Sequence, residues 1–328
     1  MARYYRTDVE RNLAVSTEIT GYAASALFWL HSVSGDARYR ECALAAARYL
    51  ASTAWDAAAQ AMPFELDPPE FTYFFDCGII VRALLAAWRA SGSGEFLSAA
   101  AALGRAMARD FASHDGDYHP VLALPEKAPA ERDALRWSRS SGCYQLKAAM
   151  AWWELAEATG DAAFRAPYES VLAFSLRTYG SFLPGHPDRL KVMDRLHAFL
   201  YFLEGMLPRA ADPRCGAAIC DGIRRAAQHL HEIAPDFARS DVYAQLLRMR
   251  LFADRAGVAP LDRDAAAQEA ADLAAFQAVS DDPRIDGGFY FGRAGGRWLP
   301  YANPVSTAFA MQALAMWQDA RPAHVELI

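Results

Sequence analysis

The chain has 328 residues, of which 53% are apolar and 22% are charged, and its formal net charge is −6 at pH 7. The high apolar share excludes a disordered chain and provides the side chains for a large core. The negative charge argues against nucleic acid as the main partner, while leaving room for an acidic ligand held in a locally basic pocket.

The cysteines and the apolar runs indicate the cellular compartment of the protein. The five cysteines are odd in number and form no CxxC pair, which favours a reduced, intracellular set over a disulfide framework. The first residues lead into charged positions, so we expect no secretory signal. No apolar run reaches the roughly 18 residues that a membrane span needs. We therefore predict a soluble, cytoplasmic protein without a membrane span.

A repeat of helical hairpins organises the first half of the chain. An aromatic-rich apolar helix, a turn and an alanine-rich helix follow one another three times, with turns at 34–39, 91–96 and 159–164. Each turn holds a glycine that can close the first helix in the left-handed conformation, then a hydroxyl or acidic residue that favours the next helix start.

The repeat weakens after residue 180 but continues to the end of the chain. Further helices are predicted over 190–207, 214–233, 240–256, 262–279 and 307–320. Strand signals are scarce, apart from possible short ribbons near 289–291 and 298–299.

About six hairpins of roughly 50–65 residues are longer than the usual helical solenoid units. They predict one all-α domain over residues 1–328, an (α/α)6 toroid whose first helices line an inner ring and whose second helices pack outside. Eleven helices are predicted, so residues 2–12 or the C-terminal tail must supply a twelfth, or the ring is incomplete. Long loops at 61–71, 112–136, 180–189 and 280–303 precede inner helices and place the site at their N-terminal ends.

The helix predicted over 190–207 carries polar residues on one face. Asp194, His197, Tyr201 and Glu204 are spaced i, i+3, i+7 and i+10. An imidazole, a phenol and two carboxylates facing the inside of a ring can position a sugar and transfer protons. The alternative is that Asp194 caps the helix and the other three side chains bond to neighbouring helices.

A similar pattern follows in the helix predicted over 240–256. Asp241, Gln245 and Arg248 lie at i, i+4 and i+7. An arginine there can bind a carboxylate or ring hydroxyls with two hydrogen bonds. Alternatively, Ser240 or Asp241 is only the N-cap.

The start of the first long helix holds Glu18 and, one turn later, Tyr22, with Ser16 as a natural cap. The helix dipole alone favours a glutamate in the first turn. Gly21 costs about 1 kcal/mol relative to alanine, so we expect a ligand or a neighbouring backbone to approach it closely.

Aromatic side chains crowd a carboxylate at the start of the next repeat, where Phe71 and Tyr73 precede Asp76. A desolvated aspartate has a raised pKa, which suits a general acid, and aromatic rings stack on sugar faces. The alternative is an N-cap packed under hydrophobic residues.

Two further segments supply candidate ligand contacts. The first segment is basic and suits a carboxylate or phosphate; the alternative is a solvated loop. The second segment precedes the last helix, and its alternative is a turn with a helix cap. Their candidates are Trp137, Arg139, Tyr144 and Lys147 in the first segment, and Tyr290, Tyr301 and Asn303 in the second.

Several motifs are absent from the sequence. It has no phosphate-binding GxxxxGKS loop, no GxGxxG after a strand, no HExxH and no paired CxxC, and its His, Cys and carboxylate residues do not cluster at metal-ligand spacing. We predict no metal and no cofactor.

The segment at 16–22 and the Gly-Asp-x-x-Tyr/Phe turns resemble the six-hairpin glycosidase-like α/α toroids. This set includes N-acylglucosamine 2-epimerase relatives, unsaturated uronyl hydrolases and proteins of bacterial exopolysaccharide loci. The resemblance implies catalysis by inner-helix carboxylates or histidines, with Glu18, Asp76, His197 and Asp241 as candidates. A local similarity of 286–289 and 306–314 to terpenoid cyclase and prenyltransferase repeats lacks the aspartate-rich motifs and the zinc ligands of those enzymes.

These features predict a protein that acts on a saccharide or uronate-containing glycan in a central cleft. Two carboxylates among Glu18, Asp76 and Asp241 suit hydrolysis, whereas His197 and Tyr201 suit elimination or epimerisation. The alternatives are a non-catalytic glycan-binding protein of exopolysaccharide biosynthesis and a terpenoid-type enzyme. All site predictions assume that the first helices of successive hairpins face a common hollow.

Overall fold

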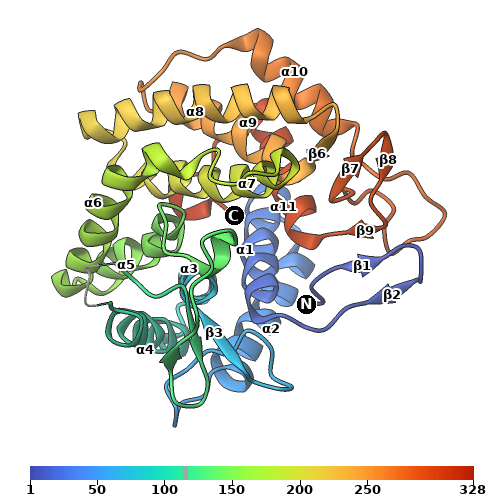
Figure 1. Ribbon diagram of the computed structural model, residues 1–328. Coiled ribbons are helices and arrows are strands. Elements are labelled where there is room, and N and C mark those ends of the chain that lie inside the picture. The colour runs from blue at the N-terminus through green and yellow to red at the C-terminus, as the bar shows by residue number, and fades with distance from the viewer. Residues whose placement is uncertain (114–116) are drawn as a thin grey trace. The chain divides into compact units, whose positions relative to one another are not determined.

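The computed structural model describes residues 1–113 and 117–328, so positions 114–116 of the predicted loop 112–136 lie outside the described residues. The described residues form eleven α-helices and several short strands (Figure 1). They divide into two compact units. Unit 1 comprises Met1–Ala2, Ala14–Arg177 and Ala323–Ile328, and unit 2 comprises Arg3–Leu13 and Thr178–Pro322.

The helices of unit 1 follow the predicted hairpin layout. α1 packs against α3, and α3 packs against α5. These three helices are buried over most of their surface, whereas α2 and α4 bury mainly one face. The helices are α1 (Thr17–Ser34), α2 (Ala37–Arg48, continued by a π-helical turn at Tyr49–Ala54), α3 (Phe74–Ser91), α4 (Gly94–Asp110), α5 (Gln145–Thr159) and α6 (Arg165–Phe182), whose last residues belong to unit 2.

The three predicted turns are confirmed. Gly35, Gly92 and Gly160 end α1, α3 and α5 with φ of 71°, 70° and 72°. The carboxylates of Asp36 and Asp161 then accept hydrogen bonds from backbone N–H groups of the next helical segment. This conformation is strained for residues with a side chain, which explains the glycine in each turn.

Small residues let the buried helices of unit 1 approach closely. A Cβ atom added to Gly21 would lie 3.3 Å from Cγ1 of Ile80 on α3. A Cβ atom added to Gly78 would overlap Ala148 on α5. The close approach predicted at Gly21 is therefore that of a neighbouring helix.

A small antiparallel sheet lies at the N-terminal end of α3 in unit 1. Its strands are β3 (Phe71–Tyr73), β4 (Val121–Ala123) and β5 (Ala128–Pro129), in the order β3-β4-β5. β3 runs directly into α3, so the sheet fixes the N-terminal end of that helix.

Unit 2 contains the helices that the sequence predicts after residue 180, with ends that differ by a few residues. α9 packs between α7 and α11, and side chains of Asp188, Asp212, Asp262 and Asn303 cap α7, α8, α10 and α11. The helices are α7 (Arg189–Gly205), α8 (Pro213–Ile233), α9 (Ser240–Arg255), α10 (Arg263–Ala274) and α11 (Pro304–Trp317).

A short sheet of unit 2 stands where the sequence allowed a twelfth helix. Residues 2–12 supply no helix: they hold the hairpin of β1 and β2, and β1 also pairs with β9. The C-terminal tail holds only a 3-10 turn at His324–Glu326, so the described residues contain no twelfth α-helix. The strands are β1 (Tyr5–Arg6), β2 (Arg11–Asn12), β6 (Phe237–Arg239), β7 (Gly292–Ala294), β8 (Arg297–Trp298) and β9 (Tyr301–Ala302).

The second sheet has the order β6-β7-β8, and β6 runs directly into α9 as β3 runs into α3. Its strand β8 includes Trp298, within one of the two predicted ribbons. No helix among the described residues has the length and apolarity needed to cross a membrane. That the whole chain forms a single domain stays a prediction.

Candidate active site

Three side chains of unit 2 lie around the buried imidazole of His197 on α7, namely Arg239 on β6 and Asp241 and Gln245 on α9. We call these four residues the histidine cluster. His197 Nδ1 lies 2.7 Å from Gln245 Oε1 and 3.4 Å from Asp241 Oδ2. His197 is 8% exposed and Asp241 only 2%. The spacing predicted for these helix faces thus brings His197, Asp241 and Gln245 together.

The surroundings of His197 set its protonation state. An ionised carboxylate can only accept, so Asp241 and the Gln245 carbonyl place the proton on Nδ1 and the lone pair on Nε2. Burial lowers the pKa of His197 to about 4, against the opposing attraction of the Asp241 carboxylate. At neutral pH the ring is therefore a neutral imidazole with Nε2 as its basic atom.

Arg239 holds the Asp241 carboxylate in place. Its Nε donates to Oδ1 at 3.0 Å and its NH2 to Oδ2 at 2.6 Å, while NH1 donates to Asp194 at 2.8 Å. Burial alone would raise the pKa of Asp241, but Arg239, His197 and the Val242 N–H lower it below its ordinary value. The Asp241 carboxylate is therefore ionised beside His197, and its charge favours a proton arriving on the ring.

The start of α9 is anchored independently of these charges. Ser240 N–H donates to Phe291 O at 3.0 Å, and its hydroxyl donates to Tyr290 O at 2.8 Å. Neither Ser240 nor Asp241 is the N-cap of α9, because Arg239 occupies that position. Asp194 is likewise not the cap of α7.

Aromatic rings enclose one side of the histidine cluster. The Tyr201 ring meets the His197 ring edge to face with centroids 4.5 Å apart, and Phe309 of α11 lies 6.3 Å from Tyr201. Such an enclosure restricts water and strengthens the electrostatic interactions within it.

Deeper in unit 2, Glu204 and Arg248 form a buried ion pair. Their side chains are 0% exposed, and Arg248 NH2 donates to Glu204 Oε1 at 2.5 Å. Arg248 NH1 also donates to Gln312 of α11 at 3.0 Å. This burial favours a structural role and agrees with the alternative that these side chains bond to neighbouring helices; their contact with substrate stays a prediction.

Unit 1 holds a pair of carboxyl groups at the starts of two buried helices. Asp76 lies in the first turn of α3, is 7% exposed, and its Oδ2 has no hydrogen-bond partner among the described residues. Burial, and then the nearby charge of Glu18 on α1, raises the pKa of Asp76 well above its ordinary value. Asp76 therefore favours the protonated form, as a proton donor requires. Glu18 follows the predicted cap Ser16, whose hydroxyl accepts a hydrogen bond from the Ile19 N–H.

Aromatic residues line the same end of unit 1. The Trp137 and Tyr144 rings meet edge to face with centroids 5.1 Å apart, and Phe75 lies 6.1 Å from Tyr144. Tyr73 packs against Phe64 at 5.4 Å. Phe64, Tyr73 and Trp137 are partly exposed and have apolar faces of the kind that stack on saccharides, whereas Phe75 and Tyr144 are buried.

The remaining predicted site residues have structural partners. Asn303 caps α11, as its alternative interpretation proposes, and Lys147 is fully buried with Nζ donating to Ile328 O at 3.1 Å. Tyr22 is 2% exposed. Other ring contacts join Tyr290 to Trp298, Tyr301 to Tyr4 and Phe291, and the Arg139 guanidinium to the Phe71 ring.

The four catalytic candidates thus fall into two clusters, Glu18 with Asp76 in unit 1 and His197 with Asp241 in unit 2. That all four face one hollow stays a prediction. Sequence reasoning missed Arg239, although an arginine two residues before Asp241 was a possible signal. Among the described residues no group of three or more His, Cys, Asp or Glu side chains is arranged to hold a metal ion.

No protein-family model matches the sequence, and no curated protein matches it. Solved structures do match over almost the whole chain. Cellobiose 2-epimerase from Spirochaeta thermophila DSM 6192 is similar with a TM-score of 0.71 and 15% identity, covering 93% of this chain and 87% of that one. A sugar epimerase from a ruminal bacterium gives a TM-score of 0.73 at 12% identity and covers 98% and 93%.

A D-mannose isomerase structure gives a TM-score of 0.65 at 10% identity, covering 96% and 90%. The fold is an α/α toroid. The predicted resemblance to six-hairpin glycosidase-like toroids is confirmed at the level of the fold. At these identities the likeness establishes the toroid alone, so the chemistry has to be argued from the two clusters.

Proposed function

We propose that this protein is a carbohydrate-active enzyme that removes the C2 proton of an aldose, leading to epimerisation or isomerisation. The observation that carries the proposal is His197, a buried imidazole that is neutral at neutral pH, with Nδ1 held by Asp241 and Gln245. Support comes from toroid structures described as cellobiose 2-epimerase, sugar epimerase and D-mannose isomerase.

The proposed reaction needs a base and stabilisation of the charge that the base acquires. Once the sugar ring has opened, Nε2 of His197 takes the C2 hydrogen as a proton, and the C–H electrons form the C1–C2 double bond of an enediolate. The positive charge on the imidazolium is stabilised by Asp241 at 3.4 Å and by the Gln245 carbonyl at 2.7 Å. Returning a proton to the opposite face of C2 gives the epimer, and returning it to C1, with the O2 proton moving to O1, gives the ketose.

The negative charge that develops on the enediolate raises the basicity of His197 as the reaction proceeds. In the resting enzyme burial disfavours the imidazolium, so its pKa is about 4. An anion formed beside the ring offsets that penalty by direct attraction. The cluster is therefore better matched to the transition state than to the resting state, as catalysis requires.

The test is exchange of the C2 hydrogen with solvent. The enzyme is incubated in D2O with glucose, mannose or cellobiose, and proton NMR follows loss of the C2–H signal. We expect exchange with at least one sugar, loss of about 10²–10⁴-fold in rate for His197→Asn, and an unchanged rate for the exposed control His231→Asn. No exchange with any of these sugars, or an unchanged rate for His197→Asn, would contradict the proposal.

A second candidate function is glycoside hydrolysis in unit 1, and it is favoured by the raised pKa and unpartnered Oδ2 of Asp76 beside Glu18. Asp76 would protonate the leaving oxygen, while Glu18 would act as base or nucleophile. Release of a chromogenic aglycone from aryl glycosides, abolished in Asp76→Asn, would favour this function. Saccharide binding without exchange or hydrolysis would favour the glycan-binding alternative.

A further inference from the structure

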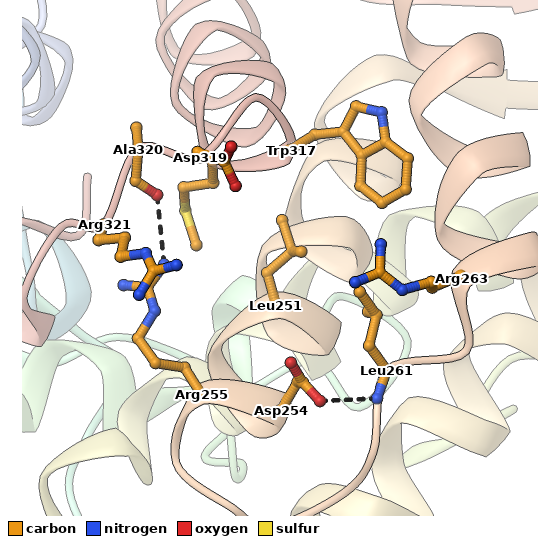
Figure 2. A pocket seen from close by; sticks show the side chains of 10 residues that line it. Leu251, Asp254, Arg255, Leu261, Arg263, Trp317, Asp319, Ala320 and Arg321 are labelled. Carbon is orange, nitrogen blue, oxygen red and sulfur yellow. Dashed lines mark hydrogen bonds between the residues drawn. The ribbon is translucent and has the colours of Figure 1, made fainter.

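Unit 2 has a cavity at the C-terminal end of α9 (Figure 2). The histidine cluster lies at the N-terminal end of the same helix. It has a volume of about 370 Å³ and is lined by the C-terminal ends of α9 and α11 and the start of α10. Asp241 is the second residue of α9 and Arg255 is its last. At 1.5 Å per residue they are about 21 Å apart along the helix axis, so the cavity is separate from the site of His197.

The cavity is lined by Arg255, Arg263 and Arg321, and not all of their N–H donors have an acceptor in the protein. Within the described parts of the chain, the guanidinium groups of Arg263 and Arg321 make no hydrogen bond and no ion pair with the protein, although both line the cavity with Asp254 and Asp319. Asp254 instead accepts a hydrogen bond from the Leu261 N–H at 2.9 Å. The guanidinium donors therefore remain available to a ligand.

Two of the arginines are held close to each other. Arg255 is fixed because NH1 donates to Pro322 O at 3.0 Å and NH2 to Ala320 O at 3.2 Å. Burial, followed by the charge of Arg321, lowers the pKa of Arg255. In Figure 2 the two guanidinium groups lie together on one side of the cavity. Like charges so placed repel each other, and a bound anion would relieve that repulsion.

The cavity also has an aromatic wall and two hydrogen-bond acceptors. Trp317 lines the cavity across from Arg321 in Figure 2. An indole face packs well against the C–H face of a sugar ring, and the carboxylates of Asp254 and Asp319 accept hydrogen bonds from hydroxyl groups. These carboxylates would repel a bare phosphate, so the mixture favours a ligand that carries both an anionic group and hydroxyls.

We propose that this cavity binds a phosphorylated monosaccharide, with its phosphate on Arg255 and Arg321 and its sugar on Trp317, Arg263 and the carboxylates. Guanidinium groups bind phosphate oxygens with paired, charge-assisted hydrogen bonds. The volume lies in the range of small-molecule sites. The proposal uses no residue of the histidine cluster and does not depend on the function proposed for it.

Isothermal titration calorimetry of the whole protein with glucose 6-phosphate tests the proposal, and glucose and inorganic phosphate serve as comparison ligands. We expect glucose 6-phosphate to bind more tightly than either. Arg321→Gln and Arg263→Gln should each weaken it by about tenfold or more, since each removes charge-assisted hydrogen bonds. Arg297→Gln removes the same charge from an exposed position on β8 and should leave the affinity unchanged.

Tryptophan fluorescence gives an independent readout. Glucose 6-phosphate should change the emission of the wild-type protein, and Trp317→Phe should abolish that change while far-UV circular dichroism stays the same. No binding of glucose 6-phosphate, equal binding of inorganic phosphate, or equal weakening by Arg297→Gln and Arg321→Gln would overturn the proposal.

Discussion

Replacing Asp241 by asparagine removes the charge that stabilises protonated His197 while keeping the shape of the side chain. Unit charges 3.4 Å apart interact by about 5 kcal/mol at an effective dielectric constant of about 20. Arg239 offsets part of this, since its charge acts on His197 in the opposite direction. We expect the transition state to lose about 2–3 kcal/mol, which lowers kcat roughly 30- to 160-fold.

The pH profile of kcat/KM in Asp241→Asn should shift in a direction that a simple loss of structure would not produce. The Asp241 carboxylate raises the pKa of His197 against the effect of burial, so Asp241→Asn should lower that pKa below about 4. The acid limb of kcat/KM, which reports the base of the free enzyme, should therefore shift to lower pH even though the rate falls.

The assay is the initial rate of C2 deuterium exchange, measured as a function of pH for the wild type and the variant. Asp194→Asn is the matched control, because Asp194 is the other carboxylate bound to Arg239. We expect Asp194→Asn to keep the rate within about threefold, in line with the small effect of a partly exposed pair. A wild-type rate in Asp241→Asn, or an acid limb that moves to higher pH, would refute the reasoning.

Three further predictions concern stability. Because the raised pKa of Asp76 makes the folded state hold this proton more tightly than the unfolded chain, its contribution is present below its ordinary pKa of 3.8 and is lost as pH rises through the folded pKa. Urea unfolding should therefore find Asp76→Asn more stable than the wild type at pH 8, with a smaller difference at pH 4; the opposite trend would contradict the assigned shift. Glu204→Gln should lower the free energy of unfolding by about 3–5 kcal/mol, because the buried Arg248 charge loses its carboxylate partner. The double replacement of Glu204 and Arg248 by methionine should cost much less; equal losses in the two variants would exclude this explanation. Gly78→Ala should cost about 1–3 kcal/mol through overlap with Ala148, and thermal unfolding should show no such loss for Gly94→Ala, where the added Cβ meets open space.

Much of the fold was predictable because its signals are local. Helical periodicity marks each hairpin, and Gly35, Gly92 and Gly160 punctuate three of them by a conformation that glycine adopts readily. The hairpin of β1 and β2 was missed because its two-residue strands carry no alternating pattern. β1 is also held by β9, almost three hundred residues further along the chain.

For the candidate site, the sequence could predict which side chains share one face of a helix. Spacing placed His197 and Tyr201 on one face and Asp241 and Gln245 on another, and the structure brings these faces together. The pairing of Arg239 with Asp194 depends on packing between β6 and α7, which no local pattern specifies. The sequence therefore indicated the groups, and the tertiary structure decided their partners and their pKa values.

Nitrogen-15 NMR of histidine-labelled enzyme, with the His197→Asn spectrum used for assignment, measures the state of the proposed base without any substrate. We predict that at pH 7 His197 carries one proton, on Nδ1, and a lone pair on Nε2. Protons on both ring nitrogens at that pH, or a single proton on Nε2, would contradict the proposed mechanism.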